Sequence, residues 1–439
     1  MKLNELKDLL RESGVVGAGG AGFPSYAKIS DKADTVILNC AECEPLLKVH
    51  RQVLEEYTVE ILSAFSDLVK AAGADRGIIA IKSHYRSALL ALENEIGDYP
   101  NLSIHTLDAV YPAGDEIILI KEVTGKIVDP GKLPISVGVT VCNVESMLNV
   151  YKAMSGTPVT DKYVTVAGEV AHPTTLRVPI GTKITELLKA VGGITVDDAA
   201  YICGGPMMGK VINPNDVITK TTNAIIVLPA DHNVIMNKNR NAAINLRRTM
   251  SVCCQCRSCT DLCSRRVLGY PVEPHLVMRV LSNGGKGDID ALDGSLFCSG
   301  CGLCETYSCP QGLSPRAMIA ELKNMARARG HKPPDDIKPD VVKDADLKKV
   351  SVERLTMRLG LKKYDVPAPI SEDFETNSVK ILTSQHLGVP AVPCVNEGDT
   401  VKKGDVIAKA VDGALSVNIH ASIDGKVTAV TPKYVKIKK

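Results

Sequence analysis

In the first 158 residues, short apolar runs alternate with stretches in which apolar residues have helical spacing. Short apolar runs rich in β-branched residues, each bounded by polar or glycine-containing segments, have the character of buried strands. These runs are TVILN (35–39), GIIAIK (77–82), LSIHTL (102–107) and VGVTVCNV (137–144). Stretches with helical spacing lie at residues 48–70, 85–96 and 116–124, and a leucine stripe over residues 3–10 precedes the first run. Strands that alternate with helices predict an α/β unit with crossover connections.

The pattern changes after residue 158. Residues 163–193 read as a hairpin followed by a helix, which predicts a small β-grasp domain that either binds a ligand or acts as a spacer. The segment GGPMMG (204–209) predicts a turn, with its methionines used for packing. Residues 240–330 have helical character. The proline-rich polar segment 332–340 predicts a linker, and the spacing of Leu347, Val350, Leu355 and Leu359 predicts an amphipathic helix after it.

The C-terminal segment is dominated by short strands. Its sequence resembles the barrel-sandwich fold of biotinyl and lipoyl carriers, which present a lysine on an exposed hairpin; here the turn reads DGALS (412–416). We therefore expect this domain to dock or pack rather than to carry a swinging arm. The expected fold class is α/β multidomain. Its units are an α/β domain (1–158), a β-grasp domain (159–235), a helical domain (240–330), a linker with a helix (331–370) and a barrel-sandwich domain (371–439).

Composition and charge exclude several function classes. The 439 residues suffice for about three domains at roughly 150 residues each. Lys and Arg total 52 against 50 Asp and Glu, so the net charge of +2 gives no sign of a nucleic-acid binder. Trp is absent and Phe occurs four times, which disfavours a base-stacking surface. No apolar run approaches the roughly 18 residues of a membrane span, and the N-terminus lacks a secretory apolar core, so we expect a cytoplasmic protein.

The cysteines carry the most specific chemistry. Nine of the 14 fall between residues 253 and 309. Cys253, Cys256, Cys259 and Cys263 form C-x2-C-x2-C-x3-C, and Cys298, Cys301, Cys304 and Cys309 form C-x2-C-x2-C-x4-C-P. The first is the bacterial ferredoxin spacing, and the second is that spacing lengthened by one residue. Because clustered cysteines in a reducing compartment bind metal or do redox work, the spacing predicts two 4Fe–4S clusters.

The fourth cysteine of a ferredoxin run ligates the other cluster. We therefore expect one cluster on Cys253, Cys256, Cys259 and Cys309, and the other on Cys298, Cys301, Cys304 and Cys263. Structural zinc is the alternative, but two triplets with two remote single cysteines fit its paired ligands poorly. Cys254 falls outside the pattern and is expected not to be a ligand. Ser264 stands where a proline usually follows the fourth cysteine, which changes the backbone hydrogen bonding there.

A glycine-rich segment and a cysteine-containing turn form a second candidate site. Residues 14–28 read GVVGAGGAGFPSYAK, and glycines let backbone N–H groups approach a phosphate closely. No Gly-Lys-Ser/Thr follows and no strand precedes, so the loop is neither a P-loop nor the ordinary dinucleotide fingerprint. The strand at 35–39 leads into CAECEP (40–45). Its C-x2-C is compatible with a thiol redox pair, but the interleaved polar residues favour a ligand-binding turn.

These segments resemble the flavin- and NADH-binding subunit of respiratory complex I. The resemblance lies in GAGGAGFPSYAK, NCAECEP, YPAGDE (111–116) and VCNVE (141–145). It implies FMN contacts from Gly17, Gly19, Gly20, Lys28, Asn39, Cys43 and Asn143. It also implies that Phe23, Lys28, Glu42 and Glu116 surround NADH. The chain departs from that family at Ala41, where an Asp is usual, and at Asp115, where a second Glu is usual.

The two-cluster segment resembles a different family. CCQCRSCTDLC with LGYPVEPH resembles RnfC-type electron-transfer subunits and, with this domain order, the cobalamin reductases of propanediol-utilisation microcompartments. This resemblance implies an NADH-dependent flavoprotein, in the cytoplasm or inside a bacterial microcompartment. It would pass electrons through FMN and two clusters to a corrinoid, to a corrinoid enzyme such as an adenosyltransferase, or to another redox protein. The alternative is a relay subunit of a larger oxidoreductase complex. No catalytic side chain is expected beyond those that hold the cofactors.

Overall fold

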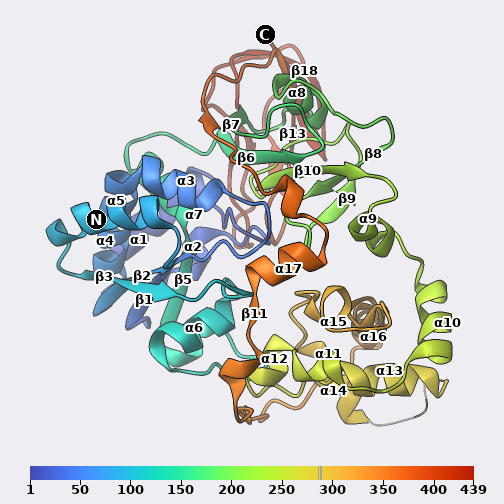
Figure 1. The fold of residues 1–439 in the computed structure, drawn as a ribbon. Helices are drawn as coiled ribbons and strands as arrows, with labels where there is room; N and C mark the ends of the chain where they lie inside the picture. Colours follow the sequence, from blue (N-terminus) through green and yellow to red (C-terminus); the bar gives the residue numbers. More distant parts are fainter. Residues whose placement is uncertain (285, 287–288) are drawn as a thin grey trace.

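The structure is a computed structural model that describes residues 1–284, 286 and 289–439 (Figure 1). Its N-terminal unit, residues 1–158, is built on a parallel sheet in the order β3-β2-β1-β5. The strands are β1 (Thr35–Cys40), β2 (Arg76–Lys82), β3 (Leu102–Leu107) and β5 (Val139–Asn143), with a short separate strand β4 (Val110–Tyr111). The four runs predicted as strands are thus confirmed, in the α/β unit that their alternation with helices predicts.

Helices cover the two faces of this sheet unequally. One face packs against α1 (Leu3–Glu12), α3 (Val49–Glu56), α4 (Thr58–Ala72), α5 (Arg86–Glu95) and α7 (Val144–Met154). The other face packs against α6 (Glu116–Thr124) and against residues 268–272 of a later unit. The single helix predicted over 48–70 is two helices, because Tyr57 leaves the helical region at φ −122° and ψ 39°.

The second unit, residues 159–235, carries a six-stranded mixed sheet. The hairpin of β6 (Asp161–Gly168) and β7 (Thr174–Pro179) is followed by α8 (Ile184–Ala190), as the β-grasp prediction requires. The sheet continues through β10 (Ala224–Pro229), β8 (Ala199–Cys203) and β9 (Lys210–Ile212). A distant segment, β12 (Ile370–Ser371), adds to β7 at the opposite edge.

The third unit is helical. Its helices are α9 (Asn233–Lys238), α10 (Ala242–Val252), α11 (Ser258–Asp261), α12 (Ser264–Val267), α13 (Pro274–Ser282), α14 (Ile289–Leu296), α15 (Leu303–Thr306) and α16 (Pro315–Ala328). Met278 of α13, Met318 of α16 and the preceding Leu313 form a small core with Leu246 of α10. The motif cysteines lie in the loops between these short helices, except Cys259 in α11 and Cys304 in α15, and α10 lies at the outer edge of the molecule (Figure 1).

Residues 331–370 form a strap between the N-terminal and helical units, and here one prediction was wrong. In place of a continuous amphipathic helix, the chain forms a 3-10 turn (Ala345–Lys348), strand β11 (Val350–Ser351) and α17 (Val352–Arg358). Val350 is extended because β11 pairs with β4 (Val110–Tyr111), and this pairing overrides the helical spacing. Leu347, expected on an apolar face, is 85% exposed.

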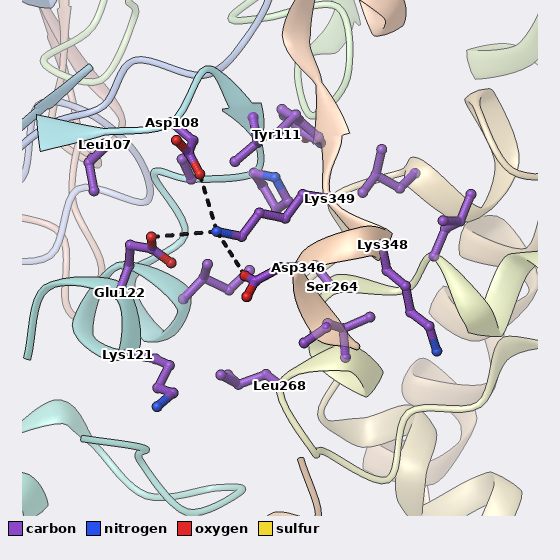
Figure 2. A pocket seen from close by; sticks show the side chains of 18 of the residues that line it. Leu107, Asp108, Tyr111, Lys121, Glu122, Ser264, Leu268, Asp346, Lys348 and Lys349 are labelled. Carbon is purple, nitrogen blue, oxygen red and sulfur yellow. Dashed lines mark hydrogen bonds and ion pairs between the residues drawn. The ribbon is translucent and has the colours of Figure 1, made fainter. Parts of the chain in front are cut away.

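The strap closes a cavity of about 160 Å³ against the N-terminal and helical units. Figure 2 shows Lys349 pointing at three carboxylates around this cavity. The Lys349 ammonium lies 3.3 Å from Asp108, 3.5 Å from Glu122 and 3.2 Å from Asp346. The contacts with Asp108 and Glu122 fasten the strap to the N-terminal unit, whereas the contact with Asp346 lies within the strap. All three pairs are solvent-exposed to some extent, so each contributes little by itself.

The C-terminal unit is a sandwich of two small sheets. One contains β13 (Ser378–Leu382), β19 (Tyr434–Lys438), β18 (Gly425–Thr431) and β15 (Thr400–Val401), and the other β14 (Val392–Pro393), β16 (Val406–Lys409) and β17 (Ile419–His420). Its 412–416 turn packs on the N-terminal unit: Arg11 donates to the Val411 carbonyl at 3.0 Å, and Tyr26 to the Ala414 carbonyl at 3.3 Å. The expectation of a docked turn is therefore confirmed. No helix in the described residues is long and apolar enough to cross a bilayer.

Candidate functional site

Hydrogen bonds hold the glycine-rich loop against the start of α7. The Gly17 amide donates to the Phe23 carbonyl at 2.9 Å, which closes the loop on itself. The Ala18 amide donates to the Ser146 hydroxyl at 2.9 Å, and that hydroxyl donates to the Val16 carbonyl at 3.2 Å. Sequence reasoning missed Ser146, because a serine in the first turn of a helix gives no signal of a distant backbone partner.

All ten residues proposed around FMN and NADH line two adjoining cavities. The first, of about 350 Å³, is lined by Gly17, Gly19, Gly20, Phe23, Lys28, Asn39, Glu116 and Asn143. The second, of about 270 Å³, is lined by Gly19, Asn39, Glu42, Cys43 and Asn143. Three of these residues line both, so the cavities adjoin at the glycine loop, at the carboxyl ends of β1 and β5. Crevices at the carboxyl ends of parallel strands are the usual ligand sites of open α/β sheets.

Local packing leaves open backbone and an unused hydrogen-bond acceptor for a ligand in this site. A Cβ at Gly19 would lie 2.4 Å from the Asn143 Nδ2 atom, whereas a Cβ at Gly20 would meet no protein atom within 4 Å. The backbone is therefore bare and open toward the cavity at Gly20. The Glu42 Oε2 atom is buried without a hydrogen-bond partner in the described part of the chain, which leaves an acceptor for a ligand.

An ion pair lies at the mouth of the first cavity. The Lys28 ammonium is 2.6 Å from a Glu116 carboxylate oxygen, and both side chains are about one-third exposed (35% and 37%). Glu116 begins α6, whose N-cap is Asp115, with a side chain that accepts from the Ile117 and Ile118 amides. The cap orients the start of the helix and so holds Glu116 beside Lys28.

The cysteines of the 40–45 turn do not form an exposed thiol pair. Cys40 packs in the N-terminal core, while Cys43 lines the second cavity. Burial raises the pKa of both thiols, that of Cys43 to about 11. Since a nucleophilic cysteine needs a lowered pKa, the geometry favours the polar ligand-binding turn.

The rest of this turn is fixed by buried hydrogen bonds. The Asn39 side chain donates to the Gly114 carbonyl at 3.0 Å and accepts from the Ala41 amide at 3.0 Å. The Glu42 carboxylate accepts from the His50 amide at 2.8 Å. Burial lowers the pKa of His50, whose ring lies 3.1 Å from the Asn143 side chain.

Glu44 joins the turn to the rest of the molecule. Its carboxylate accepts from the Met207 and Met208 amides at 2.9 and 2.8 Å, and burial raises its pKa. The Met207 carbonyl in turn accepts from Arg316 of α16 at 2.5 Å. Residues 204–209 do form the predicted turn, and the Met207 side chain is buried as expected. Met208 is 55% exposed and lines the second cavity.

The structure gathers the ferredoxin-type cysteines into two sets. The outer cysteine set, defined as Cys253, Cys256, Cys259 and Cys309, surrounds one small cavity with His275 and Met278. The inner cysteine set is defined as Cys263, Cys298, Cys301 and Cys304. Burial, together with the charges of the other members of the set, raises the pKa of Cys263 and Cys304. Each triplet thus lies beside the fourth cysteine of the other motif. This is the arrangement required for crossed ligation, in which the fourth cysteine of each motif ligates the cluster of the other.

The two sets differ in depth. Cys263 and Cys304 of the inner set are buried, whereas Cys256 of the outer set is exposed, as is the neighbouring Cys254. Burial, with the charges of neighbouring thiolates, raises the pKa of Cys259 and Cys263 to about 12. Four thiolates gathered in one place need a compensating positive charge. Both the inner and the outer cysteine set therefore suit an iron–sulfur cluster. No group of three His, Cys, Asp or Glu in the described residues is arranged for a single metal ion.

The second cavity extends from the glycine loop to the inner cysteine set. Cys301 lines it together with Gly19 and Asn143. Two buried contacts hold this junction: the Tyr111 hydroxyl donates to the Cys301 carbonyl at 2.7 Å, and Arg265 lies 2.8 Å from Asp115. The Ser264 hydroxyl is 3.8 Å from the Cys301 sulfur. The sequence did not reveal this junction, because the partners are 150 to 190 residues apart.

Comparison with protein families identifies each unit. Residues 10–152 match the Nuo51 FMN-binding domain and residues 163–211 the SLBB domain. Residues 252–314 match a 4Fe-4S dicluster domain and residues 360–439 the RnfC barrel sandwich hybrid domain. The expected architecture is confirmed, and the cofactors are FMN and 4Fe–4S clusters rather than structural zinc.

Similar proteins share this domain order. A cobalamin reductase PduS of Citrobacter freundii is 40% identical over 435 residues, which covers 98% of this chain and 96% of the relative. A PduS of Salmonella typhimurium is 39% identical, covering 100% and 97%. An RnfC-like relative, one subunit of the Na⁺-translocating ferredoxin:NAD⁺ oxidoreductase complex of Acetobacterium woodii, is 30% identical, covering 60% and 58%. Among solved structures, an NAD⁺-reducing [NiFe]-hydrogenase in its H2-reduced state superimposes with a TM-score of 0.51 at 21% identity, over 81% of this chain and 67% of that one; this likeness shows the fold alone.

Proposed function

The chain belongs to the family of PduS cobalamin reductases, and from this premise we propose that it oxidises NADH and delivers the electrons singly to a corrinoid. Family membership makes it an oxidoreductase, and its domains make it an iron–sulfur flavoprotein that carries electrons. FMN accepts two electrons as a hydride and releases them one at a time to iron–sulfur clusters. The observation that carries the proposal is the second cavity, which extends from the glycine loop to Cys301.

The residues of the flavin site have two roles, which are to bind FMN and to bind NADH. We assign FMN binding to Gly17, Gly19, Gly20, Lys28, Asn39, Cys43 and Asn143. The open backbone at Gly20 and the partly buried, hydrogen-bonded side chains of Asn39 and Asn143 support this assignment. We assign NADH binding to Phe23, Lys28, Glu42 and Glu116. Phe23 is 38% exposed at the lip of the first cavity, where an apolar ring is available for a nucleotide base.

Each of the two cysteine sets is assigned its own cluster. We assign one 4Fe–4S cluster to the inner cysteine set and one to the outer cysteine set, with Cys254 left free. Cys301 of the inner set lines the flavin cavity, and Cys263 and Cys304 of that set are buried, while the outer set has an exposed cysteine. This order places the inner set next to the flavin and the outer set next to an external acceptor.

The unit limits and the partners belong to the same proposal. The limits are those predicted from the sequence, with the flavin and NADH site in 1–158 and both clusters in 240–330. Besides NADH, the partner is a corrinoid, a corrinoid enzyme or another redox protein. The family supports a place in the cytoplasm, inside a bacterial microcompartment.

A relay subunit of a larger complex is the second candidate. It is favoured by the similarity of about 60% of the chain to RnfC-like subunits of ion-translocating oxidoreductase complexes, and by the RnfC-type C-terminal domain. A relay subunit would show little NADH oxidation by itself. The full-length match to the cobalamin reductases favours the enzyme.

Anaerobic purification of the full chain, with iron, sulfide and flavin analysis, tests the proposal. We expect FMN, two clusters and bleaching of the flavin absorbance on addition of NADH. Glu116→Ala should keep FMN but raise the KM for NADH by about tenfold, equivalent to ~1.4 kcal/mol, because Lys28 loses its partner. Asp34→Asn, which breaks the comparable Lys126 pair away from the site, is the matched control. Flavin that NADH fails to bleach would favour the relay subunit.

A further inference from the structure

The surface around the outer cysteine set has an unusual charge. Between Asp231 and Asp261 the sequence contains no acidic residue. The basic residues in this stretch are Lys238, Arg240, Arg247, Arg248 and Arg257. A run with one sign of charge next to a redox centre produces a local field even though the whole chain is nearly neutral.

The helix before the outer set displays part of this charge on an exposed face. In α10, Arg247 is exposed and Arg248 partly so, and the helix ends one residue before Cys253. At about 1.5 Å per residue, Arg247 lies roughly 8 Å along the helix axis from Val252, the residue before Cys253. Arg279 of α13 also reaches the set, because it contacts Gln255, whose amide donates to the Cys253 sulfur at 3.2 Å.

The same face is apolar between the arginines. Ile244 is 51% exposed, Met250 55% and Val252 45%. Exposed aliphatic side chains next to arginines and beside an exposed redox ligand have the composition of a small, transient protein interface. Asp261 and Glu273 lie 3.5 and 3.8 Å from Arg257, and Glu273 lies 3.6 Å from Arg266. In the described residues, neither carboxylate forms an ion pair with Arg247, Arg248 or Arg279.

We propose that this surface, defined as Ile244, Arg247, Arg248, Met250, Val252 and Arg279, docks a redox protein whose own docking face is acidic. The proposal rests on the function proposed above, since it makes the outer set the exit for electrons. Charge complementarity selects the occupant: opposite charges raise the rate of encounter and like charges lower it. In the docked complex, one electron leaves the reduced protein and one enters the partner, with no proton transferred.

Two forms of one acceptor test the surface directly. Native cytochrome c is basic, and succinylated cytochrome c is the same haem protein with its lysines converted to carboxylates. The full protein is first reduced with dithionite, so that the test does not depend on NADH, and is then mixed with each form in a stopped-flow instrument. We expect the acidic form to be reduced at least about tenfold faster at low salt and to lose this advantage at high salt.

Charge reversal assigns the effect to this surface. Arg247→Glu with Arg248→Glu should reverse the preference between the two cytochromes, while Arg247→Gln with Arg248→Gln should abolish it. Lys402→Glu with Lys426→Glu changes the net charge equally on the C-terminal unit and should leave the preference intact. Iron content and circular dichroism check that α10 and the outer cluster survive.

The outcomes separate this proposal from the proposed function. An unchanged preference in the Arg247/Arg248 variants, with intact clusters, overturns the docking surface whatever NADH does. Equal rates for the two cytochromes in the unmodified protein overturn it as well. Failure of NADH to bleach the flavin, with the charge preference intact, overturns the NADH-dependent enzyme and leaves the docking surface standing.

Discussion

The Tyr111 hydroxyl donates a hydrogen bond of 2.7 Å to the carbonyl oxygen of Cys301. Tyr111 is 3% exposed and belongs to the segment whose Gly114 carbonyl accepts from Asn39 of the flavin turn. One short segment therefore contacts both the flavin site and the inner cysteine set. This segment holds the flavin site in a fixed position relative to the inner cysteine set.

Removing the Tyr111 hydroxyl tests this role. Tyr111→Phe keeps the ring but removes a hydrogen bond worth about 1 kcal/mol, and we expect a several-fold slower transfer from reduced flavin to the clusters. NADH oxidation with a dye that takes electrons from the flavin should not change. Stopped-flow absorbance separates the two steps.

Tyr270→Phe is the matched control. Tyr270 also donates at 2.7 Å to a carbonyl of the N-terminal unit, but the acceptor is Val128 and not a ligand cysteine. Its loss should lower the free energy of unfolding by a similar amount without slowing the transfer. Equal slowing in both variants would mean that the effect is general loosening of the interface.

Two glycines distinguish ligand contact from internal packing. Gly19→Val places atoms against Asn143, and Gly20→Val places them only in open space. If the loop cradles FMN, both variants should lose most of their flavin, Gly20→Val without a loss of folded protein. Gly97→Val, at another site with open space, should keep full flavin. Full flavin occupancy in both loop variants would refute the cradle.

Crossed ligation gives a spectroscopic prediction. Cys309→Ala should remove the same EPR species as Cys253→Ala, because both belong to the outer cysteine set. Cys298→Ala should remove the other species, and Cys254→Ala should change little. If Cys309→Ala and Cys298→Ala lose the same species, the ligand sets are wrong.

One buried and one partly buried histidine of the C-terminal unit predict a pH dependence of stability. Burial lowers the pKa of His386 to about 4 and that of His420 to about 3, with nearby Lys220 adding to both shifts. Their ordinary value is about 6.5, so between these values the unfolded chain binds more protons than the folded one. The free energy of unfolding should therefore fall as the pH is lowered below 6.5.

Substitution by a neutral residue tests this origin. His386→Gln with His420→Gln should flatten the fall in melting temperature between pH 7 and 5, relative to the unmodified protein. His172→Gln, at an exposed histidine with an ordinary environment, should not. A double variant with the same pH profile as the unmodified protein would assign the acid sensitivity to other groups.

Local patterns predicted the units but not their contacts. The strands of the first sheet and the cysteine sets were recognisable because short apolar runs and C-x2-C spacings are determined within a few residues. Val350 broke its helical spacing because β4, about 240 residues earlier, supplies a strand partner. Ser146, Tyr111 and Arg265 were missed for the same reason: each acts through a partner that is distant in sequence.

The most direct test of the central claim uses a protein that lacks both clusters but retains FMN, obtained with Cys259→Ala and Cys304→Ala. The account predicts that this protein still oxidises NADH with a flavin-accessible dye and that it loses corrinoid reduction. Both rates are measured anaerobically on the same preparation, with flavin and iron content determined alongside. Corrinoid reduction at the full rate by the cluster-free protein would contradict the account. Electrons would then pass directly from the flavin to the corrinoid, and the cysteine sets would be unnecessary.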